Sequence, residues 1–305
     1  MADSQKVRTC PWQNLVSNEM KVSIIILSWN TKDLLKKCLK SIPFYAEIII
    51  VDNGSTDGTI HFLNSLKWPN LKIIKNKKNL GFAKGNNQGI KAASGDLIML
   101  LNSDTVVEKK TIEKLVNFYQ GQKNKNLALS PLLLNADGTI QQEYYMRFPN
   151  LWQIFGYHYP LLRILFMRLP LKWLAVSRMK KKPFEVEQLP GAALMAPKEV
   201  WQKVGLLDED YQFLYEDVDW CWRAKKMRVK LMVVPEAKVT HLGGGSWKKK
   251  LNWDGFEFYR DYFEALLLFV RKNYGEGKLK FFRFSLLLNF LLRGKLKLFF
   301  YFLKK

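Results

Sequence analysis

Polar side chains follow three apolar segments of the sequence, at the point where each segment ends. The segments are residues 22–27, 47–51 and 97–101, and the polar residues after them are Ser28, Asn30, Asp52, Asn53, Asn102 and Asp104. In an open α/β sheet the ligand crevice lies outside the carboxyl ends of the strands, so we expect these side chains to converge on one rim. Carboxylate and amide oxygens there can accept hydrogen bonds from a ligand or hold a hard divalent cation.

A second acidic cluster, in the segment LYEDVDW, offers a candidate for proton transfer. Glu216 and Asp217 are adjacent, and Asp219 lies three residues after Glu216, so a helix that begins here projects Glu216 and Asp219 roughly together. A carboxylate that approaches a hydroxyl directly can take its proton, and Asp217 is our candidate base. The alternative is that the carboxylates only favour a helix N-terminus.

The glycine-rich segment NLGFAKGNNQG offers a candidate site for phosphate. Its glycines, at 81, 85 and 89, would let the backbone approach a ligand, and Lys84 would counter phosphate charge. Asn79 and Asn87 are further candidates here. The alternative for all of them is an ordinary turn followed by helix packing.

The composition fits a folded protein with an anionic partner. The chain has 305 residues, of which 48% are hydrophobic, and 49 Lys and Arg against 27 Asp and Glu give a net charge of +22. Charge alone leaves nucleic acid, anionic lipid and a phosphorylated substrate open. The three cysteines show no CxxC spacing, which favours a reduced compartment over a disulfide framework.

Apolar segments that alternate with helical stretches, such as 32–41 and 59–66, predict an α/β domain over residues 22–250. A basic, aromatic stretch at about 150–183 interrupts it as an insertion. Residues 1–21 read as a leader without the apolar region of a signal peptide or anchor.

Residues 251–305 form a predicted helical tail that associates with membranes. Its longest uncharged apolar run, 284–292, is far short of the ~20 residues that a spanning helix needs. On a helical wheel Ser285, Asn289, Arg293 and Lys297 share a polar sector in a surface of Phe and Leu, which fits a helix lying in the headgroup layer. A core helix or a dimer interface is the alternative.

Four segments in this order resemble the inverting glycosyltransferases of family 2, in particular the rhamnosyltransferase-like branch that builds bacterial polysaccharides. They are SIIILSWN, IIIVDNGSTDGT, NLGFAKGNNQGI with LLNSD, and GAALMAPKEVWQKVGLLDEDYQFLYEDVDWCWRAKK ending in VTHLGGGS. The resemblance covers residues 22–246. It implies a GT-A fold, the fold of nucleotide-diphospho-sugar transferases, with a mixed, mainly parallel central sheet.

The resemblance assigns donor binding to residues of three segments. Asp52 would contact the nucleotide base, and Asn102-Ser103-Asp104 takes the place of the family's DxD motif. The donor-binding residues implied are Ser28, Asn30, Asp52, Asn79, Lys84, Asn87, Asn102 and Asp104. Asp104 and His241 would hold Mn²⁺ or Mg²⁺, although Asn102 in place of the first aspartate removes one charge.

The acceptor side follows from the same resemblance. Asp217 is the carried-over base, and Glu216 would position the acceptor or a neighbouring loop. From residue type, we expect Trp220 to stack on a sugar face and the small residues Gly191 and Ala192 to leave room for the acceptor, unless the two small residues serve strand packing and the indole packs in the core.

The resulting expectation is single-displacement transfer of a sugar, with rhamnose on deoxythymidine diphosphate as the best guess. The acceptor would be a polyprenyl-diphosphate-linked saccharide at the cytoplasmic side of the membrane, where the protein is peripheral. Two rivals are an inactive, membrane-recruited scaffold of the same fold and a basic nucleic-acid-binding protein. No recognised nucleic-acid motif supports the second, and the sequence predicts no oligomeric state.

Overall fold

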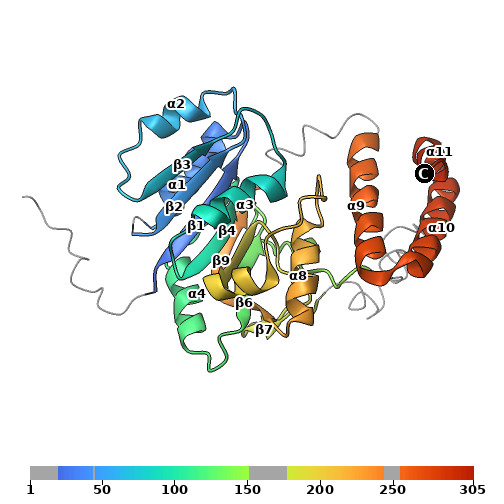
Figure 1. Cartoon of the computed structure of the whole chain (residues 1–305). Coiled ribbons are helices and arrows are strands. Elements are labelled where there is room, and N and C mark those ends of the chain that lie inside the picture. Colours follow the sequence, from blue (N-terminus) through green and yellow to red (C-terminus); the bar gives the residue numbers. More distant parts are fainter. Residues whose placement is uncertain (1–19, 44, 151–176, 244–254) are drawn as a thin grey trace, which may run out of the picture.

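The computed structural model describes residues 20–43, 45–150, 177–243 and 255–305, which form one nine-stranded mixed sheet with helices packed on it and three C-terminal helices beside it (Figure 1). The predicted leader lies outside the described residues up to residue 19, and so do residues 151–176 of the predicted insertion. The strands run in the order β3-β2-β1-β4-β8-β6-β9-β5, and β7 pairs with β9.

The first half of the sheet is parallel and carries the predicted polar rim. Its strands are β1 (Val22–Ser28), β2 (Glu47–Asp52), β3 (Leu71–Lys75) and β4 (Leu97–Asn102). The near-continuous apolar runs of β1, β2 and β4 are buried because helices cover this half, as α3 does at β1 and β2, whereas the edge strand β3 is only partly buried. Ser28 pairs in register with Asp52, and Leu27 with Asn102. The prediction that these strand ends converge is therefore confirmed.

The second half of the sheet is mixed. Its strands are β5 (Thr105–Val107), β6 (Leu127–Leu134), β7 (Phe184–Glu185), β8 (Ala193–Pro197) and β9 (Lys230–His241). β8 runs antiparallel to both β4 and β6, whereas β9 is parallel to β6 and antiparallel to β5. Thr105 pairs with His241 across β5 and β9, so the residue before β5, Asp104, is brought beside that histidine.

The helices of this unit include those expected at 32–41 and 59–66 and the one expected to begin at Glu216, together with a 3₁₀ helix at 142–145 that the sequence did not predict. They are α1 (Lys32–Ser41), α2 (Thr59–Asn64), α3 (Phe82–Ala92), α4 (Thr111–Gln120), the 3₁₀ helix η2 (Gln142–Tyr145), α7 (Lys198–Val204) and α8 (Glu216–Lys226). α8 begins at the two adjacent carboxylates of LYEDVDW, as expected for acidic residues in a first helical turn.

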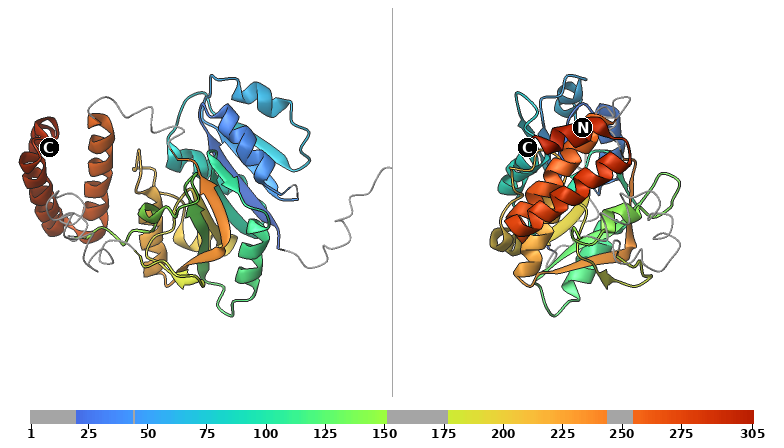
Figure 2. Two further views of the ribbon diagram at one scale, coloured as in Figure 1. Left: turned by 180° about the vertical axis from the view of Figure 1, so that it is seen from behind. Right: turned by 90° about the vertical axis from the view of Figure 1, so that its right-hand side faces the viewer.

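Three helices follow at the C-terminus: α9 (Phe256–Tyr274), α10 (Glu276–Leu292) and α11 (Leu296–Leu303). α9 lies between the sheet unit and the other two helices, which fold back beside it (Figure 2). Phe263 of α9 packs against Phe290 and Phe302, which forms a small aromatic core. No helix among the described residues has both the length and the apolar character that crossing a bilayer requires.

The predicted polar sector of the tail is wrong as a single face. Ser285 and Asn289 are buried at 3% and 1% exposure, whereas Arg293 and Lys297 are exposed. The helical wheel fails because α10 ends at Leu292 and Gly294 adopts a φ of 63°, a left-handed conformation that breaks the helix before α11.

Candidate active site

Asp52 is built to receive a hydrogen-bond donor. It ends β2 and is 1% exposed, and its Oδ2 accepts a hydrogen bond from the Ser55 backbone N–H at 3.0 Å. Its Oδ1 is buried without a hydrogen-bond partner in the described part of the chain. A buried carboxylate oxygen of this kind is costly unless a ligand satisfies it.

Asn30 and Ser28 join the loops around Asp52. The Asn30 Oδ1 accepts the Thr56 N–H at 2.7 Å, and the Asn30 N–H donates to the Ser55 hydroxyl at 2.9 Å. Ser28 is fully buried, and its hydroxyl hydrogen-bonds Thr31 at 3.1 Å. The expectation that Ser28 lines the pocket is therefore wrong in this conformation, since its hydroxyl supports the loop that carries Asn30.

The glycine-rich segment packs on the sheet more than it faces a ligand. A Cβ at Gly85 would collide with Leu27, and one at Gly89 would collide with Ile25, so these glycines let α3 approach β1. The exposed Asn79 side chain accepts the Gly81 N–H at 2.9 Å and shapes the turn before α3. We predicted that these glycines let the backbone approach a ligand, but Gly85 and Gly89 let it approach β1 instead.

Asn87 and Lys84 face different environments on α3. Asn87 is 2% exposed; its Oδ1 accepts the Leu207 N–H, and its Nδ2 donates to the Leu207 carbonyl and to Glu209. A donor-binding role for Asn87 is therefore corrected to a structural one, because its amide is fully engaged with protein. Lys84 is exposed on the first turn of α3.

Asp104 and His241 form a compact pair at the end of β4. The Asp104 Oδ1 lies 3.3 Å from His241 Nε2, and Asn102 Nδ2 lies 3.4 Å from the same nitrogen. Asp104 and His241 are 8% and 3% exposed. The predicted pairing of these two residues is thus present in the structure.

Gln141 fixes the orientation of His241 from the opposite side. Its Nε2 donates to the His241 carbonyl at 2.7 Å, so its Oε1 faces His241 Nδ1, at 3.1 Å. An amide oxygen can only accept, so His241 Nδ1 carries a proton, and its other ring nitrogen, Nε2, faces Asp104. Sequence reasoning missed Gln141, which stands 100 positions away in an unremarkable polar segment.

A divalent cation fits this pair. A carboxylate oxygen and an imidazole nitrogen that face each other are both suitable ligands for Mn²⁺. In the described ranges no group of three or more His, Cys, Asp and Glu is placed to hold a metal ion. Asp104 and His241 would therefore hold a metal only together with oxygen atoms from a bound ligand. The side-chain amide oxygen of Asn102 can supply one further oxygen.

Asp217 is held for proton transfer at the N-terminus of α8. Its Oδ2 accepts the Gly191 N–H and its Oδ1 accepts the Val218 N–H, both at 2.8 Å. A Cβ on Gly191 would come within 3.3 Å of Asp217 Oδ2, so only glycine approaches it this closely without a shift. Asp217 is half-buried, and burial raises its pKa despite these two hydrogen bonds.

Glu216 differs from its neighbour. Burial, followed by the negative charge of Asp217, raises the pKa of Glu216 to about 8, and its Oε2 has no hydrogen-bond partner among the described residues. Leu214 and Tyr215, directly before this pair, both have left-handed φ angles, of 63° and 71°. Strained backbone in non-glycine residues is typical of functional sites.

Tyr144 of η2 connects the two carboxylate sites. Its ring meets the His241 ring edge to face, with centroids 5.2 Å apart. Burial and the negative charges of Asp104 and Asp217 together raise the pKa of Tyr144, so its hydroxyl lies close enough to interact electrostatically with both carboxylates. The metal-side pair and the candidate base thus belong to one site. Tyr144 is a second residue that the sequence did not reveal.

The predicted acceptor residues divide into one at the site and two in the core. Trp220 is 0% exposed; its indole N–H donates to the Gly205 carbonyl, and its ring packs on Trp201. Acceptor contact by Trp220 is therefore wrong. Ala192 is buried, and its carbonyl accepts the Asn102 N–H, which leaves Gly191 as the residue that touches Asp217.

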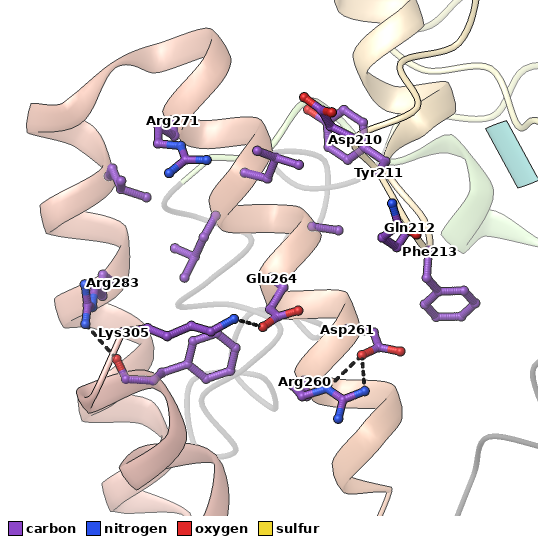
Figure 3. Close-up of a pocket in the computed structure, with 15 residues that line it drawn as sticks. Asp210, Tyr211, Gln212, Phe213, Arg260, Asp261, Glu264, Arg271, Arg283 and Lys305 are labelled. Carbon is purple, nitrogen blue, oxygen red and sulfur yellow. Dashed lines mark hydrogen bonds and ion pairs between the residues drawn. The ribbon is translucent and has the colours of Figure 1, made fainter. Parts of the chain in front are cut away.

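A cavity of about 610 Å³ lies apart from these residues, between segment 210–213 and the C-terminal helices (Figure 3). Many of its charges pair with one another, as Arg260 does with Asp261 and Lys305 with Glu264. The carboxylate oxygens without a hydrogen-bond partner belong instead to Asp52, at the end of β2, and to Glu216, at the start of α8. We therefore assign the candidate active site to the region of these residues and not to the cavity.

Comparison with solved structures identifies the fold. A mannosyltransferase from Pyrobaculum calidifontis, solved with GDP-Man and Mn²⁺, superposes with a TM-score of 0.53 at 14% identity over 85% of this chain and 66% of its own. The mixed, mainly parallel sheet with polar residues at its strand ends is the GT-A fold, as predicted.

The family follows from the sequence comparison. The model of glycosyl transferase family 2 matches residues 23–177, and the chain belongs to this family. It is 25% identical over 227 residues to a low-salt glycan biosynthesis hexosyltransferase of Haloferax volcanii, covering 73% of this chain and 67% of the relative. It is 24% identical to the poly-beta-1,6-N-acetyl-D-glucosamine synthase of Staphylococcus aureus, covering 80% of this chain but 57% of that protein.

Proposed function

We propose that this glycosyltransferase inverts the anomeric centre of a nucleotide-linked sugar, with Asp217 as the base that takes the proton of the acceptor hydroxyl. The observation that carries the proposal is the state of the Glu216–Asp217 pair. Two backbone N–H groups hold the Asp217 carboxylate, and its raised pKa makes it a better proton acceptor than an exposed aspartate. A single displacement needs no covalent intermediate, and one base is enough.

Glu216 supports this arrangement by remaining neutral near pH 7. Its pKa of about 8 keeps the proton on the buried carboxyl, so only one of the two adjacent side chains is charged. A neutral carboxyl can donate a hydrogen bond, and its unpartnered Oε2 is available to orient the acceptor or the loop beside it.

The donor would lie along the carboxyl ends of the parallel strands. The free Oδ1 of Asp52 accepts an N–H of the nucleotide base, and Asp104 with His241 would hold Mn²⁺ or Mg²⁺ near the diphosphate. Such an ion offsets the negative charge that develops on the departing nucleoside diphosphate. Gln141 keeps the Nε2 of His241 directed at this position.

The sugar and acceptor are proposed from resemblance. The rhamnosyltransferase-like motifs make deoxythymidine-diphosphate rhamnose our first candidate donor, although relatives include a hexosyltransferase and an N-acetylglucosamine polymer synthase. The names of both relatives support a role in glycan or polysaccharide synthesis, and we propose that the product belongs to the cell surface. We further propose a polyprenyl-diphosphate-linked saccharide as acceptor and a peripheral position at the cytoplasmic face of the membrane, because the basic tail attracts phosphate and anionic lipid.

Turnover across a panel of nucleotide sugars with Mn²⁺ or Mg²⁺ tests the proposal. In the presence of lipid extract, one donor should release its nucleoside diphosphate, and Asp217→Asn should lower turnover by about 10²- to 10⁴-fold while donor affinity is retained. Glu143→Gln is the matched control, since this exposed carboxylate also lies near Tyr144.

Two outcomes would contradict the mechanism. Full activity of Asp217→Asn would exclude Asp217 as the base. Donor binding without turnover for any acceptor would favour the inactive scaffold, for which Asn102 in the DxD position is the structural argument.

A further inference from the structure

The outer surface of α10 and α11 is apolar and exposed. Six side chains on it are each more than half exposed and define what we name the outer apolar face: Phe284, Leu291, Leu292, Leu296, Phe300 and Leu303, at 65%, 51%, 65%, 51%, 54% and 52%. Large contiguous apolar surfaces on a folded protein mark a binding site for another molecule or a membrane.

α10 carries large apolar side chains on its outer side as well as on its buried side, where Phe282 and Phe290 lie. Asn289 faces the protein interior at 1% exposure, and both its Nδ2 and its Oδ1 are without a hydrogen-bond partner in the described residues. Phe284 and Leu292 of the same helix are the most exposed large hydrophobic side chains of the described chain. A helix whose outer side faces water carries mainly polar residues on that side. The outer face of α10 therefore fits an apolar environment better than water.

The charge around this face identifies its occupant. Residues 276–305 contain eight Lys and Arg and one Glu, which gives 8 − 1 = +7. Lys280, Lys295 and Lys304 are exposed beside the apolar side chains. A second copy of this chain would bring an equal positive charge against it, whereas phosphate headgroups attract Lys and Arg by about 1 kcal/mol for each residue near the surface.

We infer that the outer apolar face docks on an anionic lipid bilayer, with α10 and α11 lying in the headgroup layer. This inference rests on the proposed function in so far as a lipid-linked acceptor gives the docking its purpose. The face itself, as Phe and Leu side chains among lysines, has the chemistry of helices that insert one side into the boundary between headgroups and acyl chains.

α9 transmits this orientation to the active site. Lys272 pairs with Asp208 at 2.5 Å, and Asn273 donates to Asp219 of α8 at 3.1 Å. The Tyr215 hydroxyl, one residue before Glu216, donates to the Tyr262 hydroxyl of α9 at 3.3 Å. Docking through α10 and α11 therefore sets the direction in which the α8 N-terminus, with Asp217, faces the membrane surface.

Vesicle co-sedimentation of the full chain tests the inference. Wild type should bind vesicles of phosphatidylcholine with 30% phosphatidylglycerol at least tenfold more tightly than pure phosphatidylcholine. The triple variant Phe284→Ser, Leu292→Ser, Phe300→Ser should lose at least tenfold of that affinity. Tyr45→Ser, at 57% exposure on the sheet unit, is the matched control and should bind like wild type.

Two further readouts keep the outcomes separate. The rate at which the enzyme hydrolyses the donor in the absence of lipid should be the same in the triple variant as in wild type. A lower hydrolysis rate in the triple variant would indicate that the substitutions damage the enzyme itself and not only membrane docking. Equal binding of wild type to both vesicle types, equal binding of the triple variant, or a wild-type dimer that the triple variant converts to monomer would each overturn the inference.

Discussion

Gln141 contacts His241 at both its side chain and its backbone. One amide group accepts from the Nδ1 proton and donates to the carbonyl of the same residue, at 3.1 and 2.7 Å. The imidazole can therefore neither rotate nor change tautomer without breaking one of these bonds. Residues that orient a metal-binding histidine in this way are as much a part of the site as the histidine.

Gln141→Ala is expected to weaken metal use. The concentration of Mn²⁺ that gives half-maximal donor hydrolysis should rise about 10- to 100-fold, the usual effect of removing such an orienting partner. Gln142→Ala removes the neighbouring, exposed amide and should leave this concentration unchanged. An unchanged metal requirement in Gln141→Ala would show that His241 is oriented by other contacts or is not a ligand.

Glu216→Gln is expected to change how stability depends on pH. Because folding raises the pKa of Glu216 from an ordinary 4.5 to about 8, its contribution is fully present below pH 4.5 and is lost as pH rises through 8. Between these values the wild-type free energy of unfolding should fall by up to about 1.4 kcal/mol per pH unit from this group. Urea unfolding at pH 5, 6.5 and 8 should show a flatter profile for Glu216→Gln, and parallel profiles would contradict the shifted pKa.

Gly191→Ala is expected to slow turnover more than it weakens donor binding. The added Cβ would lie 3.3 Å from both Asp217 Oδ2 and the ring of Phe82, so the carboxylate must shift by a few tenths of an ångström. Misplacing a reacting group lowers kcat, here by roughly tenfold, and the KM for donor should change little. Gly277→Ala, which meets no atom within 4 Å, is the control. Equal kcat values in the two variants would show that Gly191 does not position the Asp217 carboxylate.

Asn87→Ala is expected to destabilise the fold without a direct effect on the donor. The substitution leaves the buried backbone N–H and C=O of Leu207 without the hydrogen bonds that Asn87 makes to them, which lowers the free energy of unfolding by about 2–4 kcal/mol. Lys84→Ala, on the exposed side of the same helix, should change stability by less than about 0.5 kcal/mol. Urea denaturation compares the two, and a donor affinity lost from fully folded Asn87→Ala would restore the sequence-based interpretation.

The sequence predicted the features that repeat along the chain or lie at fixed positions in it. Apolar runs located β1, β2 and β4, and the rule that ligands bind at the carboxyl ends of parallel strands placed Asp52 and Asp104 at one edge. The adjacent carboxylates Glu216 and Asp217 fall at the N-terminus of α8, where the sequence put a helix start.

Features that depend on long-range packing could not be predicted in this way. Gln141 and Tyr144 reach the site because η2 packs beside the end of β9, and no local signal marks them. Trp220 was assigned to the acceptor on its residue type, but its position on α8 turns it toward Trp201 in the core. The helical wheel of the tail assumed one continuous helix, and the break at Gly294 separates its four polar residues.

The three hydrogen bonds of Asn87 also limit how the enzyme can move. They fasten α3, which follows the nucleotide side of the site, to the segment that leads from α7 toward the acceptor side. Separating α3 from this segment would leave a buried amide without these partners, so we expect the two elements to move together.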